Sequence, residues 1–202
     1  MALPFAGIVV AMLLVAKCSE ADTGWSERVG KVVHCDDKGT CEGMDTCVFP
    51  DATGCNRFYQ QCTKYQDGVL TIDSNVMTQL QYDDEGMTVF LTPRDAFYIK
   101  RDGTFLPVII YDNGADDFEE GMVRVSIRGK IAYYDREFRQ VIAPKYGWGW
   151  PFENGRALVC RECTFRRSGE HTSVISDSCG YIDAKGREIV PLQYPLHEAI
   201  GR

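Results

Sequence analysis

A repeat of tyrosines and glycines constrains the fold of this 202-residue chain more than any other feature. The tyrosines recur in three pairs that share one and the same spacing: Tyr98 and Tyr111, Tyr133 and Tyr146, Tyr181 and Tyr194. A series of almost evenly spaced glycines runs alongside them, at Gly86, Gly121 and Gly155. A fixed period of this order is typical of tandem structural units, each of which buries a face on its neighbour.

The residues within each period indicate β-structure. Stretches such as MVRVSI, KIAYYD, RALVC and GYID are short, rich in β-branched or aromatic residues, and partly alternating. Turn-forming pairs separate them, at Asp102-Gly103, Asn113-Gly114, Asn154-Gly155 and Lys185-Gly186. A helical period is visible only over residues 74–82. We therefore predict an all-β fold, in which tandem antiparallel β-hairpin repeats over residues 71–202 follow a disulfide-rich N-terminal segment over residues 22–70.

The last unit carries a resemblance to a known family. Its sequence GYIDAKGREIVPLQY, residues 180–194, resembles the core motif of bacterial WG-repeat proteins. Phe152, Gly155 and Val159 resemble the F-x-x-G-x-x-x-V motif that follows that core. The resemblance covers about residues 86–195 and is looser in the first unit, where Phe97 and Lys100 replace the family's glycine and aspartate. It implies a β-repeat scaffold that is frequent in exported bacterial proteins and has no single reaction attached to it.

The third unit contains an insertion. The interval from Gly155 to Tyr181 is about twice as long as the equivalent interval from Gly121 to Tyr133 in the second unit. The added stretch carries three cysteines, Cys160, Cys163 and Cys179. We predict that residues 160–179 form an inserted loop or longer hairpin that is pinned by disulfides.

The beginning of the chain predicts export. An uncharged apolar run of about 16 residues precedes Lys17, which is short for a membrane span but suits a secretory signal peptide over residues 1–21. Ser19 and Ala21 are small residues at the positions that a signal peptidase reads, so we expect cleavage after Ala21. An uncleaved anchor and a lipid anchor at Cys18 are the alternatives. Cleavage predicts a periplasmic or secreted protein with no transmembrane segment in its mature form.

Cleavage would leave an even number of cysteines: Cys35, Cys41, Cys47, Cys55, Cys62, Cys160, Cys163 and Cys179. In an exported chain such a set predicts a framework of four disulfides. Five of the eight precede residue 63 and three follow residue 159. If all eight pair, at least one bridge must join the two groups, because both counts are odd.

The charge of the chain constrains its partners. The formal net charge is −7, which argues against a nucleic-acid partner because phosphate recognition needs a basic surface. No glycine-rich phosphate loop is present, and no cofactor is expected. The three histidines, His34, His171 and His197, are read as surface residues.

Three motifs suggest chemistry, and each has a simpler structural interpretation. Cys160 and Cys163 have the CxxC spacing of a thiol–disulfide oxidoreductase, but no βαβ pattern surrounds them, so a structural bridge is the preferred interpretation. With His171 and Cys179 they could also bind zinc, although we expect no metal. The stretch DNGADDFEEG, residues 112–121, gathers carboxylates of the type that calcium prefers, and we interpret it as a solvated acidic turn.

The segment YGWGWPFENG, residues 146–155, is the strongest candidate for binding. In an extended strand Trp148 and Trp150 would share one face and the glycines between them would leave the other face bare. Adjacent indoles can stack on a sugar ring or a cation, or they can simply be buried. Arg166 and Arg167 in the insertion could contact the same ligand at the rim or belong to a solvated turn.

The sequence therefore predicts an exported, non-enzymatic binding protein with a protein or glycan partner in the cell envelope or outside the cell. The alternative is a cell-envelope enzyme, either an oxidoreductase that uses Cys160 and Cys163 or a hydrolase that uses acids that the sequence does not single out.

Overall fold

The computed structural model describes residues 29–35, 43–169 and 171–202. The predicted signal peptide, residues 1–21, lies outside these ranges. Neither helix in the described part of the chain has the length and apolar character needed to cross a membrane.

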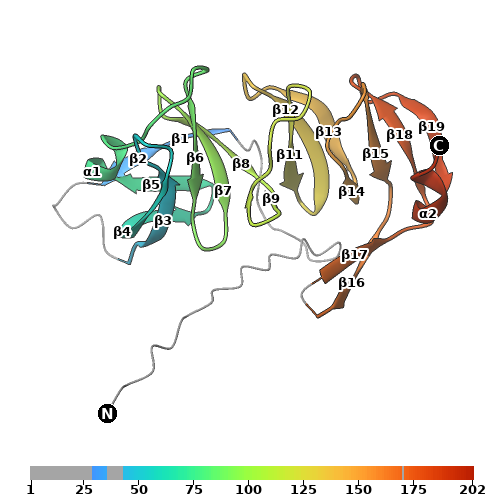
Figure 1. Cartoon of the computed structure of the whole chain (residues 1–202), viewed down its shortest axis with the longest axis horizontal. Helices are drawn as coiled ribbons and strands as arrows, with labels where there is room; N and C mark the ends of the chain where they lie inside the picture. The colour runs from blue at the N-terminus through green and yellow to red at the C-terminus, as the bar shows by residue number, and fades with distance from the viewer. Residues whose placement is uncertain (1–28, 36–42, 170) are drawn as a thin grey trace, which may run out of the picture.

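Three antiparallel three-stranded meanders form the body of the protein and stand side by side along its long axis (Figure 1). The first contains β6 (Met87–Leu91), β7 (Ala96–Lys100) and β8 (Thr104–Val108). The second contains β11 (Met122–Ile127), β12 (Lys130–Asp135) and β13 (Gln140–Tyr146). The third contains β15 (Arg156–Cys160), β18 (Cys179–Asp183) and β19 (Glu188–Tyr194), with β14 (Trp148–Gly149) at its edge. These meanders confirm the predicted all-β fold and follow the period of the tyrosines.

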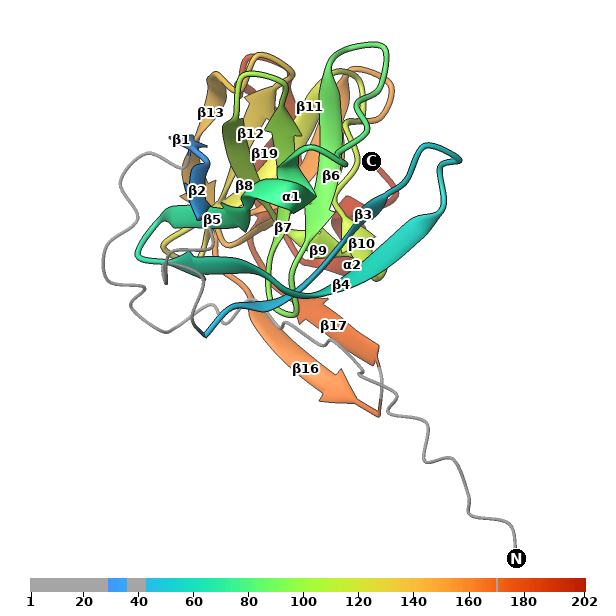
Figure 2. The ribbon, with the colours of Figure 1, turned by 90° about the vertical axis from the view of Figure 1, so that its left-hand side faces the viewer.

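The N-terminal segment continues the sheet of the first meander. It contributes β1 (Gly30–Lys31), β2 (Val33–Cys35), β3 (Asp45–Pro50), β4 (Asn56–Gln66) and β5 (Val69–Asp73), so that the strand order is β1-β8-β7-β6-β3-β4-β5-β2. The short helix α1 (Ser74–Met77) follows β5 and lies over this end of the array (Figure 2). The N-terminal segment therefore covers the outer face of the first meander.

Successive side chains along each strand point to opposite faces, so that hydrophobic cores form between neighbouring meanders. In β11 the side chains of Val123 and Val125 pack toward the first meander, in a core shared with Leu106 and Tyr98. In β12 the side chains of Ile131 and Tyr133 pack toward the third meander, and this second core includes Phe152, Ala157, Val159 and Ile182. The middle meander is thus buried on both faces, as expected for stacked repeats in which each unit contacts its neighbours.

The leading tyrosine of each repeat links its own unit to a later segment. The hydroxyls of Tyr98, Tyr133 and Tyr181 donate to the main-chain oxygens of Asp116, Trp150 and Ile200, which lie 18, 17 and 19 residues further along the chain. The three side chains are at most 9% exposed. Burial raises the pKa of Tyr98 and Tyr133 well above the ordinary value, so both hydroxyls keep their proton and act as donors.

The phenylalanine of the repeat occupies an equivalent place in two units. The ring centroids of Tyr98 and Phe118 are 4.9 Å apart, and those of Tyr133 and Phe152 are 5.1 Å apart. This match confirms the repeat of Phe118 and Phe152.

The repeat glycines make the turns that enter the second and third meanders. Glu120 and Gly121 both have positive φ, of 50° and 80°, and Asn154 and Gly155 have φ of 54° and 75°. Two successive residues with positive φ are the signature of the type I′ turn, which matches the twist of a hairpin. Glycine at the second position of each turn adopts this conformation without steric cost.

The C-terminal end of the array is closed by α2 (Leu196–Ala199), an element that the sequence did not predict. Ala199 packs in a small core with Leu158, Tyr181 and the disulfide-bonded Cys160 and Cys179 on the outer face of the third meander. The predicted helical window over residues 74–82 contains α1, which is shorter than that window.

Candidate functional site

The segment over residues 146–155 lies between the second and third meanders. Trp148 and Trp150 are both half-buried, and their rings meet edge to face with centroids 6.2 Å apart and planes at 89°. Trp148 packs against the core between the second and third meanders, whereas Trp150 packs against the C-terminal core. The two indoles therefore do not form the flat stacking platform that was one of the predicted possibilities.

The glycines of this segment are tightly packed, so the prediction that they leave one strand face bare is wrong. A Cβ at Gly149 would collide with the Tyr133 hydroxyl, and a Cβ at Gly147 would lie 3.0 Å from Sγ of Cys163. Gly147 and Gly149 are themselves buried. Their small size allows the strand to approach the second meander and the base of the insertion.

A buried ion pair that the sequence did not predict lies behind Trp148. Arg124 of β11 and Asp116 have side chains that are 1% and 2% exposed. The guanidinium donates to both carboxylate oxygens of Asp116, and its Nη1 donates to the main-chain oxygen of Gly149 at 2.9 Å. The main-chain N–H of Arg124 also donates to Asp116, at 2.9 Å. Asp116 is thus an internal anchor, and its assignment to a solvated acidic turn is wrong.

Aromatic rings surround the same guanidinium. Cζ of Arg124 lies 4.4 Å from the ring centroid of Tyr111 and 5.8 Å from that of Trp148. Tyr111 is 44% exposed, in contrast to its repeat counterpart Tyr146, which is 3% exposed. The Tyr146 hydroxyl has no hydrogen-bond partner among the residues that the structure describes. Tyr111 therefore departs from the repeat and covers the outer side of the ion pair.

The insertion forms the predicted hairpin. Its strands are β16 (Thr164–Ser168) and β17 (His171–Ile175), which pair with each other in a separate two-stranded sheet and extend away from the array (Figure 1). The disulfide between Cys160 and Cys179 closes its base. The Phe165 ring meets Trp148 edge to face at 5.7 Å, which connects the hairpin to the aromatic segment.

The two predicted binding arginines lie on this hairpin. Arg166 and Arg167 are both exposed, on adjacent positions of β16 and therefore on opposite faces of it. Nε of Arg167 donates to the main-chain oxygen of Gly169 at 3.2 Å. The structure thus brings Trp148, Phe165 and the arginine-bearing strand into one region.

The cysteines form part of the predicted framework. Cys47 pairs with Cys62, Cys160 pairs with Cys179, and Cys35 is also disulfide-bonded. Cys163 is buried at the base of the hairpin, and Cys41 lies outside the described residues. Cys55 departs from the prediction of complete pairing because it is exposed and carries a free thiol. The Cys47–Cys62 bridge lies within the N-terminal group of cysteines and the Cys160–Cys179 bridge lies within the C-terminal group. Neither of them is the predicted link between the two groups.

The Cys160–Cys179 bond affects the two alternative interpretations of the CxxC motif, a redox pair and a zinc site. Cys160 is joined to Cys179, so the two CxxC cysteines do not form a redox disulfide with each other. The same bond removes two of the four thiol and imidazole groups that a zinc site would need. Among the described residues no three His, Cys, Asp or Glu side chains are grouped as metal ligands.

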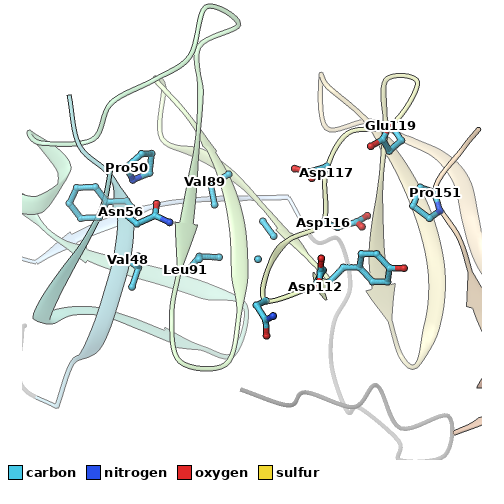
Figure 3. Close-up of a pocket in the computed structure, with 15 residues that line it drawn as sticks. Val48, Pro50, Asn56, Val89, Leu91, Asp112, Asp116, Asp117, Glu119 and Pro151 are labelled. Carbon is cyan, nitrogen blue, oxygen red and sulfur yellow. The ribbon is translucent and has the colours of Figure 1, made fainter. Parts of the chain in front are cut away.

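A groove with a volume of about 540 Å³ is lined by Asp116 of this ion pair (Figure 3). Val89 and Leu91 of β6 lie between its two walls. Val48, Pro50 and Asn56 of the β3–β4 hairpin line one wall. The opposite wall comes from the small hairpin of β9 (Ile110–Tyr111) and β10 (Gly114–Ala115), from the residues that follow it, and from Pro151.

The fold and these sites define a tandem β-meander repeat protein with a disulfide-closed hairpin in its last unit. Comparison with protein families identifies the repeat: the WG containing repeat family matches residues 132–162 and 180–195. The matched residues belong to the second and third meanders and leave out β11. The matched residues extend from β12 into the base of the insertion and resume at β18, so that the hairpin lies outside them. Comparisons with curated proteins and with solved structures gave no significant match.

Proposed function

We propose that this protein is an exported, non-enzymatic binding protein that recognises a protein or glycan of the cell envelope through its disulfide-closed hairpin. The WG repeats serve as the scaffold in this proposal. The projecting hairpin serves as the recognition element, with Trp148 and Phe165 near its base and Arg166 and Arg167 on its two faces.

The single observation that carries the proposal is the position of the β16–β17 hairpin outside the repeat. The two cores between meanders contain no residue of either hairpin strand. Arg166, Arg167 and Ser168 are all exposed, so the hairpin adds little to burial. A surface element that the scaffold does not need, held in place by a disulfide, is a common way to present binding residues on a rigid fold.

Site-specific photocrosslinking in the producing cell tests this function. A benzoylphenylalanine at position 166 is expected to give a discrete crosslinked species, because this position is on the proposed surface. The matched control carries the same group at position 185, where exposed Lys185 occupies the β18–β19 turn away from the hairpin. Equal crosslinking at both positions, or none at position 166, would contradict the proposed surface.

A charge reversal at the two arginines of the hairpin tests whether their positive charge is needed for crosslinking. Arg166→Glu with Arg167→Glu is expected to abolish crosslinking from a probe at position 173 on the paired strand, while the fold and the disulfide remain intact. N-terminal sequencing of the mature protein addresses export separately, and the expected first residue is Asp22.

A further inference from the structure

We propose that the groove between the β3–β4 hairpin and the β9–β10 hairpin binds an extended peptide segment in which a lysine or arginine is next to an apolar residue. This site lies apart from the β16–β17 hairpin and is independent of the function proposed for it. The ligand class follows from three properties of the groove: its apolar floor, its open strand edge and its unneutralised carboxylates.

The floor of the groove is apolar. Val89 and Leu91 are half-buried and point from β6 to the side on which the β9–β10 hairpin lies. Half-buried Val48 and Pro50 extend this surface on the opposite wall. A volume of about 540 Å³ is in the range of small-ligand sites, so the groove can take a few residues of an extended chain rather than a folded domain.

One strand edge is open at the groove. β3 and β6 are neighbours in the eight-stranded sheet, but they pair only at Val48 and Leu91. Continued antiparallel pairing would place Pro50 opposite Val89. Because Pro50 has no N–H, it cannot donate to the main chain of Val89, and the two strands diverge there. Val89 is therefore not paired with β3, and in this proposal the peptide adds to this edge of β6.

The wall opposite β3 is acidic. Asp112, Asp117 and Glu119 are exposed, and none of them forms an ion pair with a residue that the structure describes. Asp116 between them is neutralised by Arg124, so the net charge of this wall is −3. Three unpaired carboxylates beside an apolar floor complement a cationic side chain that is adjacent to an apolar one.

The wall is also rigid. Asp112 and Asn113 form the two-residue turn of the β9–β10 hairpin with φ of 48° and 67°, and Asp116 after this hairpin is fixed to β11 by the buried ion pair. The Tyr98 hydroxyl also donates to the main-chain oxygen of Asp116, at 3.0 Å. The main chain that carries the carboxylates is thus anchored to β7 and β11, which lowers the entropic cost of binding.

Fluorescence anisotropy of the full chain with labelled hexapeptides tests the proposal. An alternating lysine–valine hexapeptide is expected to bind, and its affinity is expected to fall as salt is raised. The glutamate–valine hexapeptide is expected not to bind, and the lysine–serine hexapeptide is expected to bind at least about tenfold more weakly because it cannot use the apolar floor. Equal binding of the lysine–valine and lysine–serine peptides would overturn the assignment of the floor.

Variants locate the binding. Asp117→Lys with Glu119→Lys is expected to weaken the lysine–valine peptide at least about tenfold. The control is Asp84→Lys with Asp177→Lys, which changes the net charge equally at exposed acids outside the groove and is expected to change the affinity less than about threefold. Equal losses in both variants would show attraction to net charge alone and would overturn the site, as would absence of binding by the unmodified protein. Crosslinking from position 166 would be unaffected by either result.

Discussion

Replacement of Arg124 by methionine is expected to destabilise the protein severely. Methionine keeps most of the volume and removes the charge. The buried Asp116 carboxylate would then keep one hydrogen-bond donor among the described residues, the main-chain N–H of residue 124, and the main-chain oxygen of Gly149 would lose the Arg124 donor. Breaking a buried pair by removing one partner typically costs about 3–5 kcal/mol.

For a chain of this size that loss corresponds to a decrease in Tm of roughly 6–20 °C. Urea unfolding followed by tryptophan fluorescence measures it well, because Trp148 lies 5.8 Å from the guanidinium. Arg166→Met on the exposed strand β16 is the control, and its effect is expected to be within about 0.5 kcal/mol.

The double variant separates the charge from the packing. Adding Asp116→Asn to Arg124→Met removes the stranded charge but keeps an oxygen for the main-chain N–H at residue 124. Much of the lost stability should therefore return. A loss below about 1 kcal/mol in the single variant, or a further additive loss in the double variant, would refute the reasoning that the pair is a buried, mutually dependent unit.

Three other predictions concern the third meander. Cys160→Ser with Cys179→Ser is expected to lower the free energy of unfolding by about 3 kcal/mol, measured in urea, and to make the hairpin the first site of limited proteolysis; unchanged proteolysis would contradict this. Gly180→Ala is expected to destabilise by about 1–3 kcal/mol because a Cβ there would collide with main-chain oxygens of β19, and an unchanged Tm would be inconsistent with that packing. Hydrogen bonds from Arg187 hold the pKa of Asp183 below its usual value. The stabilisation from these hydrogen bonds is present above the unfolded pKa and is lost as pH falls through the folded pKa. An NMR titration of Arg187→Met should give a pKa of Asp183 that moves toward the ordinary value, because the side-chain bond is lost while the main-chain N–H groups of residues 185 and 187 still donate.

The repeat was predictable because its signals are local. The tyrosines, the turn glycines and the alternating strands specify hairpins that need no distant partner to be recognised, and the extra residues between Gly155 and Tyr181 located the insertion. Phe118 and Phe152 confirm the register of two units through equivalent ring contacts.

The candidate sites were less predictable because they depend on contacts between units. Alternation along the stretch MVRVSI does not say whether the face that carries Arg124 is buried or exposed. Arg124 is internal because the middle meander is buried on both faces. A charged residue inside an otherwise apolar strand was the available signal, and Asp116 was its available partner. The groove joins residues 48, 89 and 117, which no local pattern connects.

The disulfide pairing was also only partly predictable from the sequence. Each of the two groups of cysteines has an odd number, which requires a bridge between the groups only if every thiol is oxidised. Cys55 is exposed and carries a free thiol. The bond between Cys160 and Cys179 could not be read from spacing, because it follows from the pairing of β15 with β18 across the inserted hairpin.

The tyrosine hydroxyls have a consequence for the length of such a protein. Each of them ties its unit to a segment 17 to 19 residues further on, so the joint is the same whether the next element is another meander or the terminal helix. A second copy of residues 121–154 inserted after the first would therefore keep the acceptor of its Tyr133 hydroxyl, but its Arg124 would need a new anion, because Asp116 lies outside the copied segment. The acidic groove belongs to the N-terminal end and the projecting hairpin to the last unit, so the number of meanders sets the separation between these two surfaces.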